Sequence, residues 1–117
     1  MSLSNITKSV IIMYGTEVTY ISTSLTIAPS GAYIRTEGSS TTIKVLEEDD
    51  IEGWREQYGV YDINPDVVFY TYYEPQKGDR IVRNGVKYVI VRTNKAKLGN
   101  MGGYYWMACK RLDVEET

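Results

Sequence analysis

Apolar and polar residues alternate over residues 18–27, a period-2 pattern typical of β-strands in a half-buried sheet. Strands are also predicted at residues 67–73, which are dense in aromatic and β-branched side chains, and at residues 79–83, 86–93 and 104–112. Residues 32–36 and 41–45 predict a further hairpin, with residues 37–40 as its turn. The apolar run at residues 10–14 is short and rich in β-branched side chains, so residues 7–14 are predicted to form a buried strand.

Turn and helix signals divide these strands. Asn84-Gly85 is the strongest signal for a two-residue hairpin turn, and Pro29-Ser30-Gly31 marks another turn. Only residues 50–58 predict a helix. The apolar residues there are spaced to share one helix face: Ile51, Trp54 and Tyr58. Asp49 and Glu52 have the spacing of a capping box, and Gly59 gives a stop signal.

These elements predict one all-β domain over residues 1–117, mainly antiparallel. The expected architecture is a small β-barrel or sandwich with one short helix and a long flexible loop. Residues 1–6 and 113–117 are expected to fray.

The chain has no histidine and one cysteine, Cys109. This composition excludes a catalytic Ser-His or Cys-His pair, a four-ligand zinc site and an internal disulfide. We therefore expect no catalytic, metal-binding or cofactor-binding residues, and a protein that is not an enzyme. Cys109 is predicted to be a buried structural thiol. No apolar run is long enough for a transmembrane helix, and the first residues do not resemble a secretory signal.

Charge is distributed unevenly. Residues 47–66 carry eight acids and one base, whereas residues 77–111 carry nine bases and one acid. Such asymmetry suits head-to-tail association of copies or contact with a polyanion; alternatively, the two halves face each other or solvent. The candidate acids of a subunit interface are Glu47, Glu48, Asp49, Asp50 and Glu52. The candidate bases are Arg80, Arg83, Lys87 and Arg92.

A glycine-rich basic loop is predicted over residues 94–103, longer than a hairpin requires. It lacks the residue order of a phosphate-binding loop, so we interpret it as a mobile, basic loop that orders on a partner. Its candidate contact residues are Lys95, Lys97, Leu98, Gly99, Asn100, Met101 and Gly102.

Tyrosine is unusually frequent, with eleven copies. Tyr70, Tyr72, Tyr88 and Tyr104, with nearby Lys and Arg, are candidates for stacking on single-stranded nucleic acid. The alternative is that the rings fill a small barrel. A carboxylate-based hydrolase ranks last, because no spacing of acids supports a particular catalytic pair.

The last third of the chain carries a family resemblance. The stretches Tyr73-Glu74-Pro75-Gln76-Lys77-Gly78-Asp79-Arg80-Ile81-Val82, Asn84-Gly85-Val86-Lys87-Tyr88-Val89-Ile90-Val91 and Tyr105-Trp106-Met107-Ala108-Cys109-Lys110-Arg111-Leu112 occur in that order. This order resembles the small head–tail joining proteins of tailed phages and prophages, also called head-closure, stopper or head-completion proteins. The resemblance covers about 40 residues well.

The resemblance implies a structural virion protein: a small β-barrel with a long flexible segment, present as a ring beneath the portal in the virion neck and in the host cytoplasm before assembly. Its implied partners are copies of itself, portal or adaptor proteins, tail proteins and, without sequence specificity, packaged DNA, but no membrane. The resemblance implies that the flexible segment lines or closes the central channel of the ring, and this segment would be residues 94–103 or 46–65. We expect the isolated protein to be monomeric or weakly associated.

Overall fold

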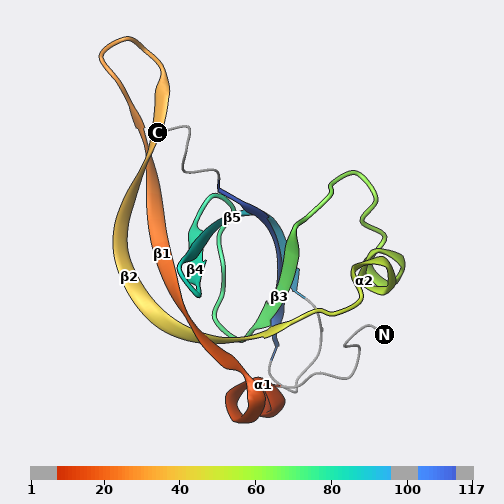
Figure 1. Cartoon of the computed structure of the whole chain (residues 1–117). Coiled ribbons are helices and arrows are strands. Elements are labelled where there is room, and N and C mark those ends of the chain that lie inside the picture. The colour runs from red at the N-terminus through yellow and green to blue at the C-terminus, as the bar shows by residue number, and fades with distance from the viewer. Residues whose placement is uncertain (1–7, 96–102, 113–117) are drawn as a thin grey trace.

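A computed structural model describes residues 8–95 and 103–112 of the chain. Six antiparallel strands close into a barrel in the order β1-β2-β3-β6-β5-β4, with two helices outside it (Figure 1). The strands are β1 (Thr16–Ile27), β2 (Tyr33–Glu47), β3 (Val67–Thr71), β4 (Arg80–Arg83), β5 (Val86–Lys95) and β6 (Tyr105–Arg111). The helices are α1 (Lys8–Tyr14) and α2 (Ile51–Tyr58). The predicted all-β, mainly antiparallel class is confirmed.

The barrel closes where the middle of β1 pairs with β4, over Thr19–Ile21 and Arg80–Val82. Beside this seam, Asn84 (φ 53°) and Gly85 (φ 78°) connect β4 to β5. Both turn residues have positive φ, as the predicted two-residue turn requires. Closure removes the exposed sheet edges that the shorter strands would otherwise leave open.

Alternating side chains of the barrel strands build two separate apolar clusters. On β3, Val67 and Phe69 belong to the inner cluster, and Val68 and Tyr70 to the outer one. β6 repeats the alternation, since Met107 and Cys109 face the inner cluster and Trp106 and Ala108 the outer one. Both strands are therefore buried on two faces, which accounts for their nearly continuous apolar sequences.

Helix α2 covers the outer cluster, as its predicted apolar face required. Trp54 is fully buried and its ring centroid lies 5.1 Å from that of Trp106 in an edge-on contact. Burying a large apolar side chain is worth about 1.5–3 kcal/mol, more than the about 1 kcal/mol that Gly53 costs in a helix. The N-cap of the helix is Asp50 rather than Asp49, because the Asp50 carboxylate accepts the Gly53 N–H at 3.0 Å. It ends at Gly59.

Two local predictions are wrong. The described part of residues 7–14 is helix α1 rather than a strand. Its Ile11 is fully buried in the outer cluster, so one face of a short helix uses the apolar run. Residues 37–40 are not a turn either, because β2 runs through them without interruption. They contain a β-bulge, where the register shifts from Ile21↔Ser40 to Thr23↔Glu37.

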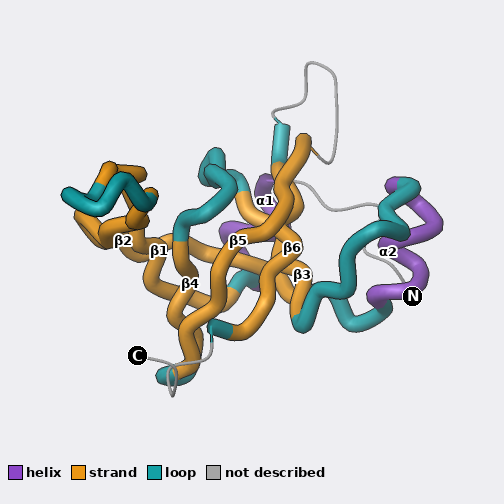
Figure 2. Tube along the Cα trace, turned by 90° about the horizontal axis from the view of Figure 1, so that it is seen from above, coloured by secondary structure: helices purple, strands orange, loops and turns teal. Residues whose placement is uncertain are grey.

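The β1–β2 ribbon elongates the molecule to 47 × 29 × 28 Å. The Cα radius of gyration is 14.8 Å, whereas a compact domain of this length is expected near ~13 Å. Seen from above, the end of the ribbon and α2 lie on opposite sides of the barrel (Figure 2). The elongation therefore comes from the ribbon extending beyond the barrel wall.

Candidate interaction site

The most distinctive surface is the outer half of the β1–β2 ribbon, residues 22–42, which we call the arm. β2 pairs with β3 only over Val45–Glu47, and the β1 contact with β4 ends at Ile21. Beyond these points the two strands pair only with each other. The turn at the tip is closed by two backbone hydrogen bonds, Ala28 N to Ala32 O at 2.7 Å and Gly31 N to Ala28 O at 2.8 Å, as the Pro29-Ser30-Gly31 signal predicted.

The outer end of the arm exposes large apolar side chains. Leu25 is 55% exposed, Ile27 65% and Tyr33 69%. Ile27 pairs with Tyr33 and Leu25 pairs with Arg35 across the two strands, so these four side chains share one face. No charged residue occurs between Ser24 and Ile34. Apolar groups gathered on a projecting element typically mark a contact with another macromolecule.

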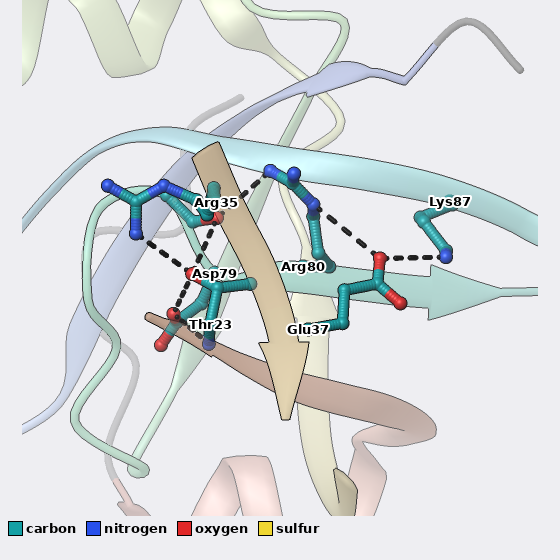
Figure 3. A network of polar contacts seen from close by, with 7 residues as sticks. Thr23, Arg35, Glu37, Asp79, Arg80 and Lys87 are labelled. Carbon is teal, nitrogen blue, oxygen red and sulfur yellow. Dashed lines mark hydrogen bonds and ion pairs between the residues drawn. The ribbon is translucent and has the colours of Figure 1, made fainter. Parts of the chain in front are cut away.

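A buried carboxylate holds β1 where it leaves the barrel. Asp79 is 5% exposed, and its Oδ1 accepts the backbone N–H and the hydroxyl of Thr23, both at 2.9 Å (Figure 3). Its Oδ2 accepts the Tyr20 hydroxyl. Tyr20 in turn accepts the Gln76 N–H at 2.9 Å. Hydrogen bonds to a buried carboxylate are stronger than neutral ones. We call Tyr20, Thr23 and Asp79 the arm anchor.

Burial, followed by the hydrogen bond to Asp79, raises the pKa of Tyr20 well above that of a free tyrosine. The phenol therefore stays protonated and remains a donor to Asp79 throughout the physiological range.

Charged side chains of β2 strengthen the anchor from outside. Arg35 Nη1 donates to the Thr23 hydroxyl at 2.9 Å and its guanidinium covers Gly78. Two residues further along β2, Glu37 accepts Lys87 Nζ at 2.8 Å and lies 3.7 Å from Arg80 Nε (Figure 3). Both strands of the ribbon are thus tied to β4 and its neighbouring residues at the base of the arm. The arm is held in a defined direction by polar contacts as well as by strand pairing.

All four candidate interface bases have ion-pair partners within the chain. Arg80 and Lys87 share Glu37, and Arg83 pairs with Glu47 while lying over the rings of Phe69 and Tyr88. Arg92 makes two hydrogen bonds with Asp62, at 2.8 and 2.7 Å. Two of these contacts, Arg83–Glu47 and Arg92–Asp62, join the basic segment to the acidic one. Their role in a subunit interface stays a prediction.

The candidate interface acids mostly serve the start of α2. Glu48 is buried, accepting the Tyr70 hydroxyl at 2.7 Å and the Asp50 N–H at 3.0 Å. Glu52 lies 3.3 Å from Arg55, and Asp49 is exposed. The N–H of Gly53, which donates to Asp50, lowers the pKa of that carboxyl. The acidic run therefore has a structural use at a helix N-terminus.

The structure describes residues 46–65, one of the two candidate flexible segments, but only three residues of the other, residues 94–103. Of the loop at residues 94–103, Lys95 ends β5 and is exposed, whereas Lys97, Leu98, Gly99, Asn100, Met101 and Gly102 lie outside the described residues. Residues 46–65 are folded. There Arg55 is buried and donates to Ile63 O at 2.6 Å and to Asn64 Oδ1. Which of the two segments contacts a partner stays a prediction.

The tyrosines proposed for base stacking are mostly inside the protein. Tyr70, Tyr88 and Tyr104 are buried, and Tyr72 is half-buried. Desolvation strongly raises the pKa of Tyr70, and the hydrogen bond to Glu48 raises this pKa further. Their positions agree with rings that fill the apolar clusters, and they give the nucleic-acid hypothesis no support. Cys109 is buried as predicted, and burial raises the pKa of its thiol.

Metal and small-molecule sites can be assessed for the described residues. No group of three Asp, Glu or Cys residues there is close enough to hold a metal ion. A cleft of about 340 Å³ lies at the C-terminal end of β5 and has a single carboxylate, Glu74, in its wall. In the same part of the chain, no helix has the length and apolar character needed to cross a bilayer.

One indirect signal of the arm anchor is visible in the sequence. Asp79 is the one acid in the basic segment and follows Gly78 in the block that carries the family resemblance. Its partners Tyr20 and Thr23 come from the other end of the chain. No protein-family model matches the chain, and no curated protein matches it either.

Proposed function

We propose that this chain is a structural subunit of the head–tail connector of a tailed phage or prophage, where a ring of copies closes the DNA-filled head and docks the tail. The proposal begins with the resemblance of residues 73–112 to head–tail joining proteins. This block supplies β4, β5 and β6, three of the six barrel strands. It also supplies Asp79, which anchors the arm.

The observation that carries the proposal is the anchored arm. A barrel that worked alone would gain nothing from a projecting ribbon with exposed Leu25, Ile27 and Tyr33. A subunit of a larger assembly needs such an element, because each copy in a ring must reach a neighbour through a surface outside its own core. The partners proposed are other copies, a portal or adaptor protein and a tail protein.

Packaged DNA is a further contact in this proposal. Lys95 at the end of β5 and Lys110 and Arg111 at the end of β6 are exposed cations. Contacts between such side chains and phosphates are independent of base sequence. Sequence-independent contact is what a protein that retains DNA of any sequence requires.

Inactivating the gene in the phage or prophage that carries it tests the proposal. Electron microscopy of the lysate is expected to show heads without tails that have lost DNA, and mass spectrometry of normal virions is expected to detect the chain. Supplying the intact gene in trans is the control and should restore tailed particles. Normal yields of tailed, infective particles without the gene would overturn the proposal.

A further inference from the structure

Helix α1 and the tip of the arm lie at opposite ends of the β1–β2 ribbon (Figure 1), and each has exposed apolar side chains. The arm patch comprises Leu25, Ile27 and Tyr33 near the tip. The foot patch lies on α1, directly before β1, and comprises Ile12, Met13 and Tyr14, which are 43%, 68% and 69% exposed. Helix α1 buries Ile11 against the outer cluster and leaves Ile12, Met13 and Tyr14 exposed.

The two patches have opposite charges beside them. Arg35 lies opposite Leu25 in the arm. Glu17 lies opposite Lys44, whose ammonium donates to the Ile12 carbonyl oxygen at 2.8 Å, so Glu17 is next to α1. Among the ion pairs of the described residues, neither Arg35 nor Glu17 takes part. Each patch thus combines three exposed apolar side chains with one exposed charged side chain, Arg35 at the arm and Glu17 at the foot, while the ammonium of half-buried Lys44 is bound to the Ile12 carbonyl oxygen.

We propose that the arm patch of one copy packs against the foot patch of a second copy, with Arg35 facing Glu17. Arm-to-arm contact would bring two copies of Arg35 together, and foot-to-foot contact two copies of Glu17. Like charges in an apolar contact are unfavourable, so the charges select the mixed contact.

When the arm patch of one copy binds the foot patch of another, the pair still has one free arm patch and one free foot patch. Further copies can therefore add through the same contact, which builds a ring or a filament. This inference rests on the proposed function, because a ring of copies is the assembly that it serves. It places the contact on the ribbon rather than on Arg80, Arg83, Lys87 and Arg92, which already have carboxylate partners in their own chain.

Disulfide trapping tests this contact even if association is weak. Ile27→Cys labels the arm patch and Met13→Cys labels the foot patch, while native Cys109 is buried and does not compete. The two variants are mixed with oxidised glutathione and separated on a non-reducing gel. The mixed dimer is expected to exceed either homodimer by roughly tenfold, because the charges disfavour like pairs. One chain with both cysteines is expected to give a ladder of oligomers.

Tyr61→Cys is the matched control, since Tyr61 is an equally exposed aromatic residue distant from both patches in sequence. Mixed dimers no more abundant than those formed with the Tyr61→Cys variant would overturn the proposal. A dominant arm-to-arm homodimer would overturn it as well.

Charge reversal gives a second readout. Adding Glu17→Arg to the foot-labelled chain is expected to reduce the mixed dimer severalfold, because it would then face Arg35. Adding Arg35→Glu to the arm-labelled chain is expected to restore it. Loss of cross-linking without rescue by the paired change would reject the Arg35–Glu17 contact.

The outcomes separate this inference from the proposed function. A ladder of oligomers from a gene whose loss leaves virions normal would reject the connector function and keep the contact. Tailless heads after gene loss, with no cross-linking between arm and foot, would keep the connector function and reject this contact.

Discussion

The two halves of the β1–β2 ribbon contain similar side chains in different surroundings. In the barrel half, Ile43 pairs with Val18 and both are buried in the inner cluster. In the arm half of the same strand, Ile34 pairs with Thr26 and is 48% exposed. Continuous antiparallel pairing runs through both halves apart from one β-bulge.

The difference comes from the other strands. β3 and β4 pair with the ribbon only near Val45–Glu47 and Thr19–Ile21, so only that half is enclosed. Apolar residues in the arm are therefore available to another molecule, whereas those in the barrel contribute to the stability of the fold. The predictions below separate these two roles.

The largest contrast is expected between two identical substitutions on β2. Ile43→Ala is expected to lower the free energy of unfolding by about 2–5 kcal/mol, because it leaves a cavity in a closed core. Ile34→Ala is expected to change it by no more than about 0.5 kcal/mol, because the side chain is exposed. Urea unfolding of both variants measures the difference. Equal losses would mean that the arm is packed against something in the isolated chain.

The arm anchor is expected to give the next largest effect. Asp79→Asn removes a charged acceptor from Thr23 and Tyr20, and is expected to cost about 1.5–3 kcal/mol. Amide hydrogen exchange is expected to speed up in residues 22–42 more than in the barrel strands, because the ribbon loses its attachment at the base.

Glu37→Gln is the matched control for the anchor, since it removes only a partly exposed ion pair with Lys87 and Arg80. Its expected cost is about 0–1 kcal/mol. A control variant that loosens the arm as much as Asp79→Asn would assign the anchoring to the surface charges instead.

A smaller effect is expected from crowding at Gly78. Gly78 (φ 96°) and Gly85 (φ 78°) both have backbone conformations that side chains rarely adopt, so alanine is expected to cost about 1–2 kcal/mol at either site. Only at Gly78 would the added Cβ overlap the Arg35 guanidinium. The Gly78→Ala variant is therefore expected to be the less stable of the two in thermal unfolding. Equal melting temperatures would show that Arg35 moves away at no cost.

The smallest effect concerns the exposed pair of Asp62 and Arg92. The hydrogen bonds from Arg92 lower the pKa of Asp62. A carboxyl with a lowered pKa in the folded state adds stability above its unfolded pKa and loses it as the pH falls through the folded pKa. An NMR titration is expected to show Asp62 titrating below an ordinary aspartate, and Arg92→Gln should return it toward the usual value. An unchanged titration in that variant would contradict the pairing.

Local signals predicted the elements that local chemistry determines. The helix α2 and the turn at Asn84-Gly85 follow from capping and backbone freedom, and the strands β3 and β6 follow from their aromatic and β-branched side chains. The run at residues 10–14 was misassigned because a short apolar run fits a strand or one face of a helix equally well. The β-bulge was taken for a turn because residues 37–40 contain the glycine and serines typical of turns.

The arm anchor depends on contacts that no local pattern contains. Asp79 lies 56 residues along the chain from Thr23 and 59 from Tyr20, and only barrel closure brings them together. The charge segments were recognised correctly as a pattern, but their sequence did not reveal that Arg83 and Arg92 pair with Glu47 and Asp62 in the same chain.

The central claim is that the arm patch serves assembly and not folding. A triple variant with Leu25→Ser, Ile27→Ser and Tyr33→Ser, supplied in trans to a phage or prophage lacking the gene, tests it most directly. We predict a folded protein whose melting temperature matches that of the unmodified chain and a lysate without tailed particles. Tailed, infective particles at the normal yield would contradict the claim.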